Sequence, residues 1–230
     1  MEAARRLAAD VALHNNHLTT GFLGTPYLCQ VLSDHGYLDT AYALLMQESY
    51  PSWLYPVWAG ATTIWERWDG IKPDGTFEDP EMNSFNHYSY GSIDAWMYGV
   101  VAGIEVDPAM PGYKHVLIQP QPGGGLTFVR ATEQTPYGEV ASAWEVDGGT
   151  LSLTVRIPAN TTATVSMPGA TLDAVRESGQ PLARADGVAN ARQKDASVVA
   201  DLGAGVYHFS YPAEALTRQL RTDEPARAGR

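Results

Sequence analysis

The sequence predicts an α+β multidomain chain, with a helical part up to about residue 108 followed by an antiparallel β-sandwich. Apolar residues recur at helical spacing before Pro108, and short alternating runs separated by turn residues follow it. The chain has 230 residues, of which 44% are hydrophobic. This length and composition are enough to bury the core of one large or two small domains.

Four helices are expected before residue 60. Residues 2–13 alternate charged and small apolar residues at helical spacing. Pro26 stands near the start of a second helix, and Asp39 is expected to cap a third, so that the two form an antiparallel hairpin. Ser52 is a candidate cap for a short helix that runs through Trp58.

A loop and a long helix are expected next. Residues 69–83 are rich in turn dipeptides and predict a loop over the helical layer. A calcium loop is disfavoured because Lys72 and Pro73 fall where an EF-hand needs ligands. Asn83-Ser84 then offers a cap, and residues 85–103 carry ring and aliphatic side chains at helical periodicity. This segment is predicted to be the longest helix of the chain.

The β-sandwich is assigned to residues 109–215. Residues 150–157 alternate as a strand with one buried face does. A disordered tail is expected at residues 216–230. The short β-rich runs are residues 114–119, 126–132, 139–146, 151–157, 163–167 and 206–211.

Composition excludes several classes of partner. The formal net charge of −11, with no basic cluster, argues against binding to nucleic acid or to an anionic membrane surface. No apolar run reaches the roughly 20 residues that span a bilayer. The N-terminus has no apolar segment typical of a signal peptide, which says nothing about compartment if the chain is a fragment. Cytoplasmic and secreted locations both stay open.

No metal or cofactor is expected. The single cysteine, Cys29, excludes an intrachain disulfide and a zinc site built on several thiolates, and it falls on an apolar helix face. His14 and His17 form an H-x-x-H pair without a third ligand nearby, so a helix end is favoured over a metal site. Phosphate-binding, dinucleotide-binding and nucleophile-elbow motifs are absent from the sequence.

An aromatic window between Tyr50 and Tyr98 carries the strongest functional signal. It holds five of the six Trp residues, and Glu66 stands between Trp65 and Trp68. Carbohydrate sites need this mixture, because rings cover the apolar faces of a sugar while carboxylates satisfy its hydroxyls. The alternative is an aromatic core segment in which Glu66 forms a surface ion pair with the neighbouring arginine.

Several motifs together resemble the C-terminal part of bacterial α-L-rhamnosidases of glycoside hydrolase family 78. The resemblance runs from about residue 17 to about residue 170, with the motifs in family order. It implies a six-hairpin α/α toroid, truncated on its N-terminal side, followed by a β-sandwich. It also implies an enzyme that hydrolyses terminal α-L-rhamnosides with inversion. The motifs are residues 17–22, 50–58, 60–70, 83–88 and 112–115.

The resemblance assigns the general base to Glu66, within the Trp-Glu-Arg-Trp motif. It also implies that His87 hydrogen-bonds sugar hydroxyls from the start of the long helix, with Asn86 beside it in a polar cleft. Trp58, Trp65 and Trp68 are candidate stacking platforms, each of them equally compatible with a core position. Asp69 and Asp79 are both open as residues that help to hold the water.

The family's general acid lies in earlier helices of the toroid, so the chain is expected to carry half of a two-carboxylate site. Its expected partners are a rhamnose-containing glycoside or oligosaccharide and the upstream part of the same catalytic domain. A truncated toroid would expose apolar helix faces, and the isolated chain is expected to be inactive. A non-catalytic carbohydrate-binding module is the alternative function.

Overall fold

A computed structural model describes residues 2–213, so the tail expected at residues 216–230 lies outside the described part. The chain divides between Trp96 and Met97 into two compact units. The change in sequence periodicity falls later, near Pro108, and the domain bounds 1–108 and 109–215 stay predictions. No helix within residues 2–213 is long and apolar enough to cross a membrane.

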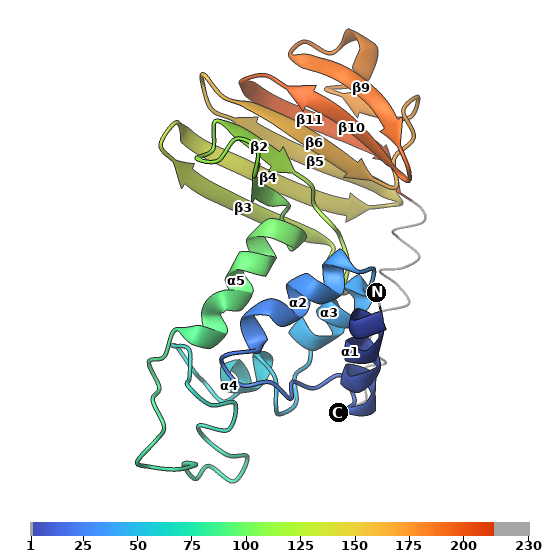
Figure 1. Ribbon diagram of the computed structural model, residues 1–230. Coiled ribbons are helices and arrows are strands. Elements are labelled where there is room, and N and C mark those ends of the chain that lie inside the picture. Colours follow the sequence, from blue (N-terminus) through green and yellow to red (C-terminus); the bar gives the residue numbers. More distant parts are fainter. Residues whose placement is uncertain (1, 214–230) are drawn as a thin grey trace. The chain divides into compact units, whose positions relative to one another are not determined.

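Four helices open the first unit, as predicted: α1 (Glu2–Leu13), α2 (Thr25–Asp34), α3 (Leu38–Leu45) and α4 (Leu54–Trp58) (Figure 1). Helices α2 and α3 pack against each other and share a core that includes Leu32 and Leu44, both fully buried. Cys29 lies in this core, where burial raises the pKa of its thiol to about 12, as expected of an inert cysteine.

The predicted caps have different outcomes. Asp39 is not the cap of α3, because the helix begins one residue earlier at Leu38 and has no side-chain cap. Ser52 does act at the start of α4: its hydroxyl accepts a hydrogen bond from the Tyr55 N–H at 3.1 Å.

The helix predicted over residues 85–103 begins later than expected and is irregular. It consists of the 3₁₀ turn η1 (Ser89–Ser92), α5 (Ile93–Trp96) and the π-helical η2 (Met97–Val101), which opens the second unit. Residues 85–88 are not helical, because the backbone of this segment pairs with residues 64–66 instead. The Asn83-Ser84 helix cap was therefore a wrong prediction.

The second unit contains two sheets, seen as two layers of arrows in Figure 1. One has the strand order β1-β2-β6-β10-β9 and the other the order β3-β4-β5-β11-β7-β8. The main strands are β1 (Ile104–Val106), β2 (His115–Ile118), β3 (Phe128–Thr135), β4 (Gly138–Asp147), β5 (Thr150–Ile157), β6 (Thr162–Pro168), β9 (Val188–Lys194), β10 (Ser197–Leu202) and β11 (Gly205–Pro212), with the two-residue strands β7 (Arg176–Glu177) and β8 (Gln180–Pro181).

The predicted alternation of buried and exposed residues is confirmed in this unit. Leu151, Leu153 and Val155 of β5 are fully buried, and Phe209 of β11 is almost so. One pair departs from the antiparallel expectation, because β2 runs parallel to β6. Strands β9 and β10, which had not been predicted, complete that sheet.

Candidate active site

Glu66 is held by backbone pairing between two segments distant in sequence. The Glu66 N–H donates to the Ser84 carbonyl at 2.8 Å, and the Ser84 N–H donates to Oε2 of Glu66 at 2.9 Å. Further along, the His87 N–H donates to the Ile64 carbonyl at 2.9 Å. The candidate base and the candidate sugar ligand therefore lie on paired stretches of backbone that fix their separation.

A buried aromatic contact between the two paired segments stabilises this arrangement. Trp65 is only 5% exposed and lies edge-on to Phe85, with 5.3 Å between ring centroids. Gly70 approaches both rings so closely that a Cβ there would meet each of them, and the Asn83 amide oxygen, at 3.1 Å. Asn83 also donates through Nδ2 to the Gly70 carbonyl at 2.8 Å. Trp65 thus packs largely in the core, and it also contributes to the wall of a neighbouring cavity.

A cavity of about 430 Å³ opens beside Glu66. Trp68 forms part of its wall, stacked on Tyr90 with 3.6 Å between ring centroids and 9° between ring planes. The indole Nε1 donates to the Thr20 carbonyl at 3.0 Å, so this hydrogen bond joins Trp68 to the segment 18–22, which also lines the cavity. The lining residues are Leu18, Thr19, Thr20, Gly21, Phe22, Tyr50, Pro51, Glu66, Arg67, Trp68, Asp69, Met82 and Tyr90.

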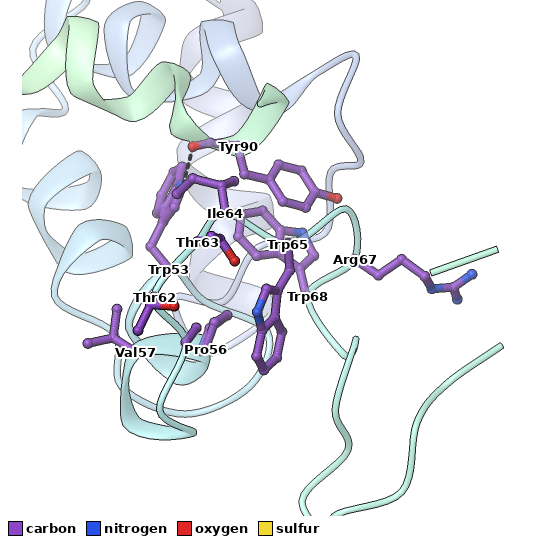
Figure 2. A pocket seen from close by; sticks show the side chains of 11 residues that line it. Trp53, Pro56, Val57, Thr62, Thr63, Ile64, Trp65, Arg67, Trp68 and Tyr90 are labelled. Atoms are coloured by element: carbon purple, nitrogen blue, oxygen red, sulfur yellow. Dashed lines mark hydrogen bonds between the residues drawn. The ribbon is translucent and has the colours of Figure 1, made fainter. Parts of the chain in front are cut away.

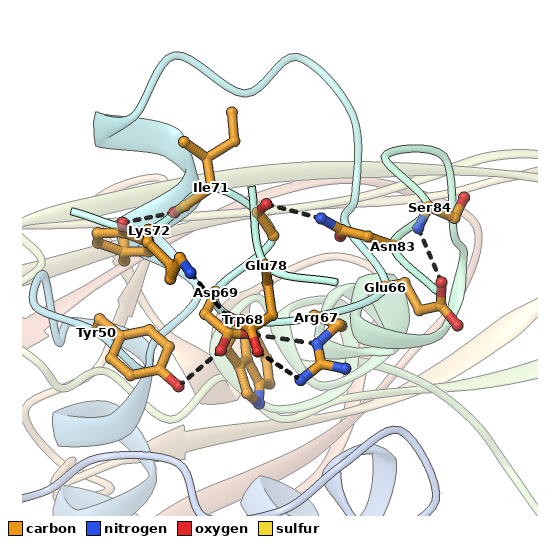
Figure 3. A network of polar contacts seen from close by, with 12 residues as sticks. Tyr50, Glu66, Arg67, Trp68, Asp69, Ile71, Lys72, Glu78, Asn83 and Ser84 are labelled. Atoms are coloured by element: carbon orange, nitrogen blue, oxygen red, sulfur yellow. Dashed lines mark hydrogen bonds and ion pairs between the residues drawn. The ribbon is translucent and has the colours of Figure 1, made fainter. Parts of the chain in front are cut away.

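Charged side chains at the edge of this cavity form one network (Figure 3). Arg67 contacts Asp69 at 3.3 Å and Glu78 at 3.6 Å, and Lys72 contacts Glu78 at 3.5 Å. The Tyr50 hydroxyl donates to Oδ2 of Asp69 at 3.5 Å. Partial burial, and then the negative charge of Asp69, raise the pKa of Tyr50 above its ordinary value. Tyr50 therefore stays a protonated donor at neutral pH.

Glu66 stands apart from that network. Within residues 2–213, no cation lies within ion-pair distance of its carboxylate, and Arg67 points to Asp69 instead. The surface ion pair with Arg67 considered from the sequence is therefore not formed. Both oxygens of Asp69 have partners, and Asp79 is exposed and does not line the cavity.

His87 is half-buried just outside the cavity. Its ring lies 5.7 Å from the ring of Phe22, which does line the cavity, and stacks on Tyr88 at 5.4 Å. Only Tyr88 separates it from η1, and the Ser89 N–H donates to Nδ1 of His87 at 3.4 Å, so His87 lies at the start of this 3₁₀ turn rather than of a long α-helix.

The remaining candidates lie outside the cavity. Trp58 is 70% exposed at the end of α4, and Asn86 is exposed on the loop that carries His87. Neither side chain lines the cavity beside Glu66.

A second cavity, of about 300 Å³, lies against the same aromatic wall (Figure 2). It shares Arg67, Trp68 and Tyr90 with the first cavity, and its other walls are mainly apolar. Trp53 contributes to it, held by a hydrogen bond from its Nε1 to the Tyr90 carbonyl at 3.0 Å. Trp68 and Tyr90 therefore separate an apolar hollow from the cavity that contains the carboxylate.

Sequence reasoning did not assign site roles to Tyr50, Arg67 or Tyr90, or to residues 18–22. The available signal was that most of them fall within the motifs that carry the family resemblance. Among the described residues, no cluster of three or more His, Cys, Asp or Glu side chains could hold a metal ion. His17 instead pairs with the Ser49 hydroxyl at 2.8 Å.

The helical unit with its aromatic cavity and the unit with two sheets each match a known domain family. Residues 1–101 match the family described as bacterial alpha-L-rhamnosidase 6 hairpin glycosidase domain, and residues 103–181 match the bacterial alpha-L-rhamnosidase C-terminal domain. Two consecutive stretches of the chain therefore match the catalytic and C-terminal domain models of bacterial α-L-rhamnosidases.

Individual relatives agree with this assignment. An alpha-L-rhamnosidase of Streptomyces avermitilis is 46% identical over 90% of this chain, and one of Formosa agariphila is 49% identical over 72%. The crystal structure of the Streptomyces avermitilis enzyme complexed with L-rhamnose superposes with a TM-score of 0.82, at 46% identity over 90% of this chain. The Aspergillus terreus enzyme gives a TM-score of 0.77 at 34% identity over 91% of this chain.

The chain spans only a small share of these proteins. It covers 19% of the Streptomyces avermitilis protein and 18% of that of Formosa agariphila, and 19% and 21% of the two crystallised chains. It is therefore similar to the C-terminal part of much longer enzymes.

Proposed function

We propose that this chain is the C-terminal part of an α-L-rhamnosidase that hydrolyses terminal α-L-rhamnosides with inversion, and that Glu66 is the general base. The observation that carries the proposal is the position of Glu66: the residue lines an aromatic cavity, and its carboxylate has no cation partner among the described residues. A base needs an oxygen that is free to accept a proton, and Glu66 meets this condition.

Inversion requires two carboxyl groups separated by about 6.5–9.5 Å, which leaves room for water between base and anomeric carbon. In the proposed reaction, Glu66 takes a proton from that water as its oxygen attacks the anomeric carbon. A carboxylic acid protonates the departing glycosidic oxygen. We place this acid in the upstream part of the catalytic domain, because Asp69 and Glu78 are engaged by Arg67.

The sugar is proposed to lie against Trp68, with Tyr50 and His87 as hydrogen-bonding groups near it. Trp68 and Tyr50 line the cavity. The His87 ring contacts the ring of Phe22, which also lines the cavity. L-Rhamnose is the ligand in the solved complex of the Streptomyces avermitilis relative, which supports the same sugar class here. Trp58 and Asn86 are proposed to contact the part of the substrate outside the cavity, since both side chains are exposed and neither lines the cavity.

The experiment fuses this chain to the upstream part of the Streptomyces avermitilis enzyme and measures hydrolysis of an aryl α-L-rhamnoside. Glu66→Gln keeps the size of the side chain but cannot take a proton, so we expect kcat to fall by about 10²-fold or more with KM nearly unchanged. Asp79→Asn is the matched control, because it neutralises an exposed carboxylate outside the cavity.

Two readouts separate this proposal from its alternatives. Azide should restore part of the rate of Glu66→Gln, because a small anion can replace the activated water. Proton NMR should show product of inverted anomeric configuration, and retained configuration would rule out a base role for Glu66. Rhamnose binding without turnover in the complete fusion would favour a carbohydrate-binding module instead.

A further inference from the structure

The two oxygens of the Glu66 carboxylate have different surroundings. Oε2 accepts the hydrogen bond from the Ser84 N–H at 2.9 Å (Figure 3). Neither a hydrogen bond nor an ion pair with a described residue engages Oε1. Since Glu66 lines the cavity, Oε1 is the oxygen available to a water molecule there.

We propose that Ser84 is a positioning residue for Glu66, and that it acts through its peptide N–H rather than its hydroxyl. The bond to Oε2 fixes the plane of the carboxylate, so that Oε1 is the atom that takes the proton from water. This inference rests on the proposed general-base role. It adds an assignment of the two oxygens and a residue that determines their orientation.

The local backbone explains how an N–H group can hold a carboxylate in a single orientation. The Glu66 N–H also donates to the Ser84 carbonyl at 2.8 Å. Two hydrogen bonds therefore connect Ser84 and Glu66. A charge-assisted N–H···O⁻ bond is also about twice as strong as a neutral one. A half turn about the terminal bond only exchanges two equivalent oxygens, so the contact fixes the plane of the carboxylate and leaves one oxygen without a described partner.

The Ser84 hydroxyl has a separate role. It accepts a hydrogen bond from the Asn86 N–H at 3.2 Å and so supports the turn that follows. The donor segment is held from its other end by Asn83, through the bond to the Gly70 carbonyl. Misplacement of a reacting group by about 1 Å can cost about 10²-fold in rate, so a fixed donor segment has a direct kinetic consequence.

The contact can be tested on the 230-residue chain by NMR, independently of any activity. In the wild-type protein, the Ser84 amide proton shift should follow the protonation of the Glu66 side chain as pH is lowered. In Glu66→Gln that dependence should disappear, whereas in Ser84→Ala the amide of residue 84 should still show it because the N–H is retained. A Ser84 amide that does not respond while the Glu66 carboxyl carbon titrates would overturn the proposal.

The catalytic consequence is tested in the fused enzyme with Ser84→Pro, which removes the N–H and keeps the carbonyl. We expect its kcat to lie at least about tenfold below that of Ser84→Ala, with KM within about twofold, since only the orientation of the base is lost. Equal kcat values in the two variants would refute the positioning role.

The two arms also separate failure of this inference from failure of the proposed function. If Glu66→Gln retains full activity, the base assignment is wrong even when the amide titrates. If Glu66→Gln is inactive but the Ser84 amide does not respond to pH, the base assignment stands and the Ser84 contact is wrong. The NMR arm remains decisive even if Ser84→Pro does not fold.

Discussion

Replacement of Trp68 would show whether the wall of the cavity also stabilises the helical unit. The indole stacks on Tyr90 at 3.6 Å and lies edge-on to Trp53 at 5.6 Å. Its Nε1 donates to the Thr20 carbonyl at 3.0 Å. Trp68→Ala removes all three interactions, and Trp68→Phe removes the hydrogen bond while keeping a ring that can stack.

The expected magnitude follows from these contacts. Each aromatic pair contributes about 0.5–1.5 kcal/mol beyond area burial, and the hydrogen bond about 1 kcal/mol. Truncation of a buried Trp to Ala costs about 3–5 kcal/mol, and Trp68 is half-buried. We therefore expect Trp68→Ala to lower the free energy of unfolding of this unit by about 3 kcal/mol. The loss for Trp68→Phe should be about 1 kcal/mol.

The assay is urea unfolding followed through amide resonances of α2 and α3, which report on the helical unit rather than on the sandwich. A double-mutant cycle with Tyr90→Ala should give a coupling energy of about 0.5–1.5 kcal/mol for the stacked pair. A loss below about 1 kcal/mol for Trp68→Ala, or a coupling energy near zero, would show that the stacked wall contributes no stability.

Two further predictions concern packing and pH. Gly70→Ala should lower the free energy of unfolding by about 1–3 kcal/mol, because its Cβ would meet Asn83 and two aromatic rings at 3.1 Å. Gly21→Ala is the control, since a Cβ there meets no atom within 4 Å, and urea midpoints of both variants provide the measurement. In the sandwich, Asn190 is the main donor that lowers the pKa of Asp201 below its ordinary 3.8. The stabilisation of the folded state by ionised Asp201 is fully present above pH 3.8 and is lost as pH falls through the lower folded-state pKa. The difference in free energy of unfolding between wild type and Asp201→Asn should therefore shrink below about pH 4. A difference that is constant from pH 6 to the acid limit of folding would contradict this.

The regular elements could be predicted because their signals are local. The apolar spacing of residues 2–13 and the alternation of residues 150–157 each correspond to an observed element. The parallel pairing of β2 with β6 could not be predicted, because alternation has the same period in both kinds of sheet. Strand β9 was missed because its side chains are largely exposed and polar, so it lacks an apolar face.

The site illustrates the same limit. Asn83-Ser84 has the composition of a helix cap, yet Ser84 bonds to Glu66, a residue distant in sequence. The bond to Glu66 competes with helix capping and depends on the tertiary fold, so local sequence propensity cannot predict it. Glu66 could be singled out because its neighbours are aromatic, and its role as the base stays a prediction. The burial of Trp65 depends on the packing of Phe85 and Gly70 against it.

The pairing of residues 64–66 with residues 84–87 has a consequence for how such sites can diversify. The intervening loop begins and ends at anchored points, since Asn83 is bonded to Gly70 and Ser84 to Glu66. Doubling the length of a flexible loop costs only about 0.6 kcal/mol of closure entropy. Insertions and deletions near residues 74–82 can therefore reshape the cavity rim while the carboxylate keeps its place.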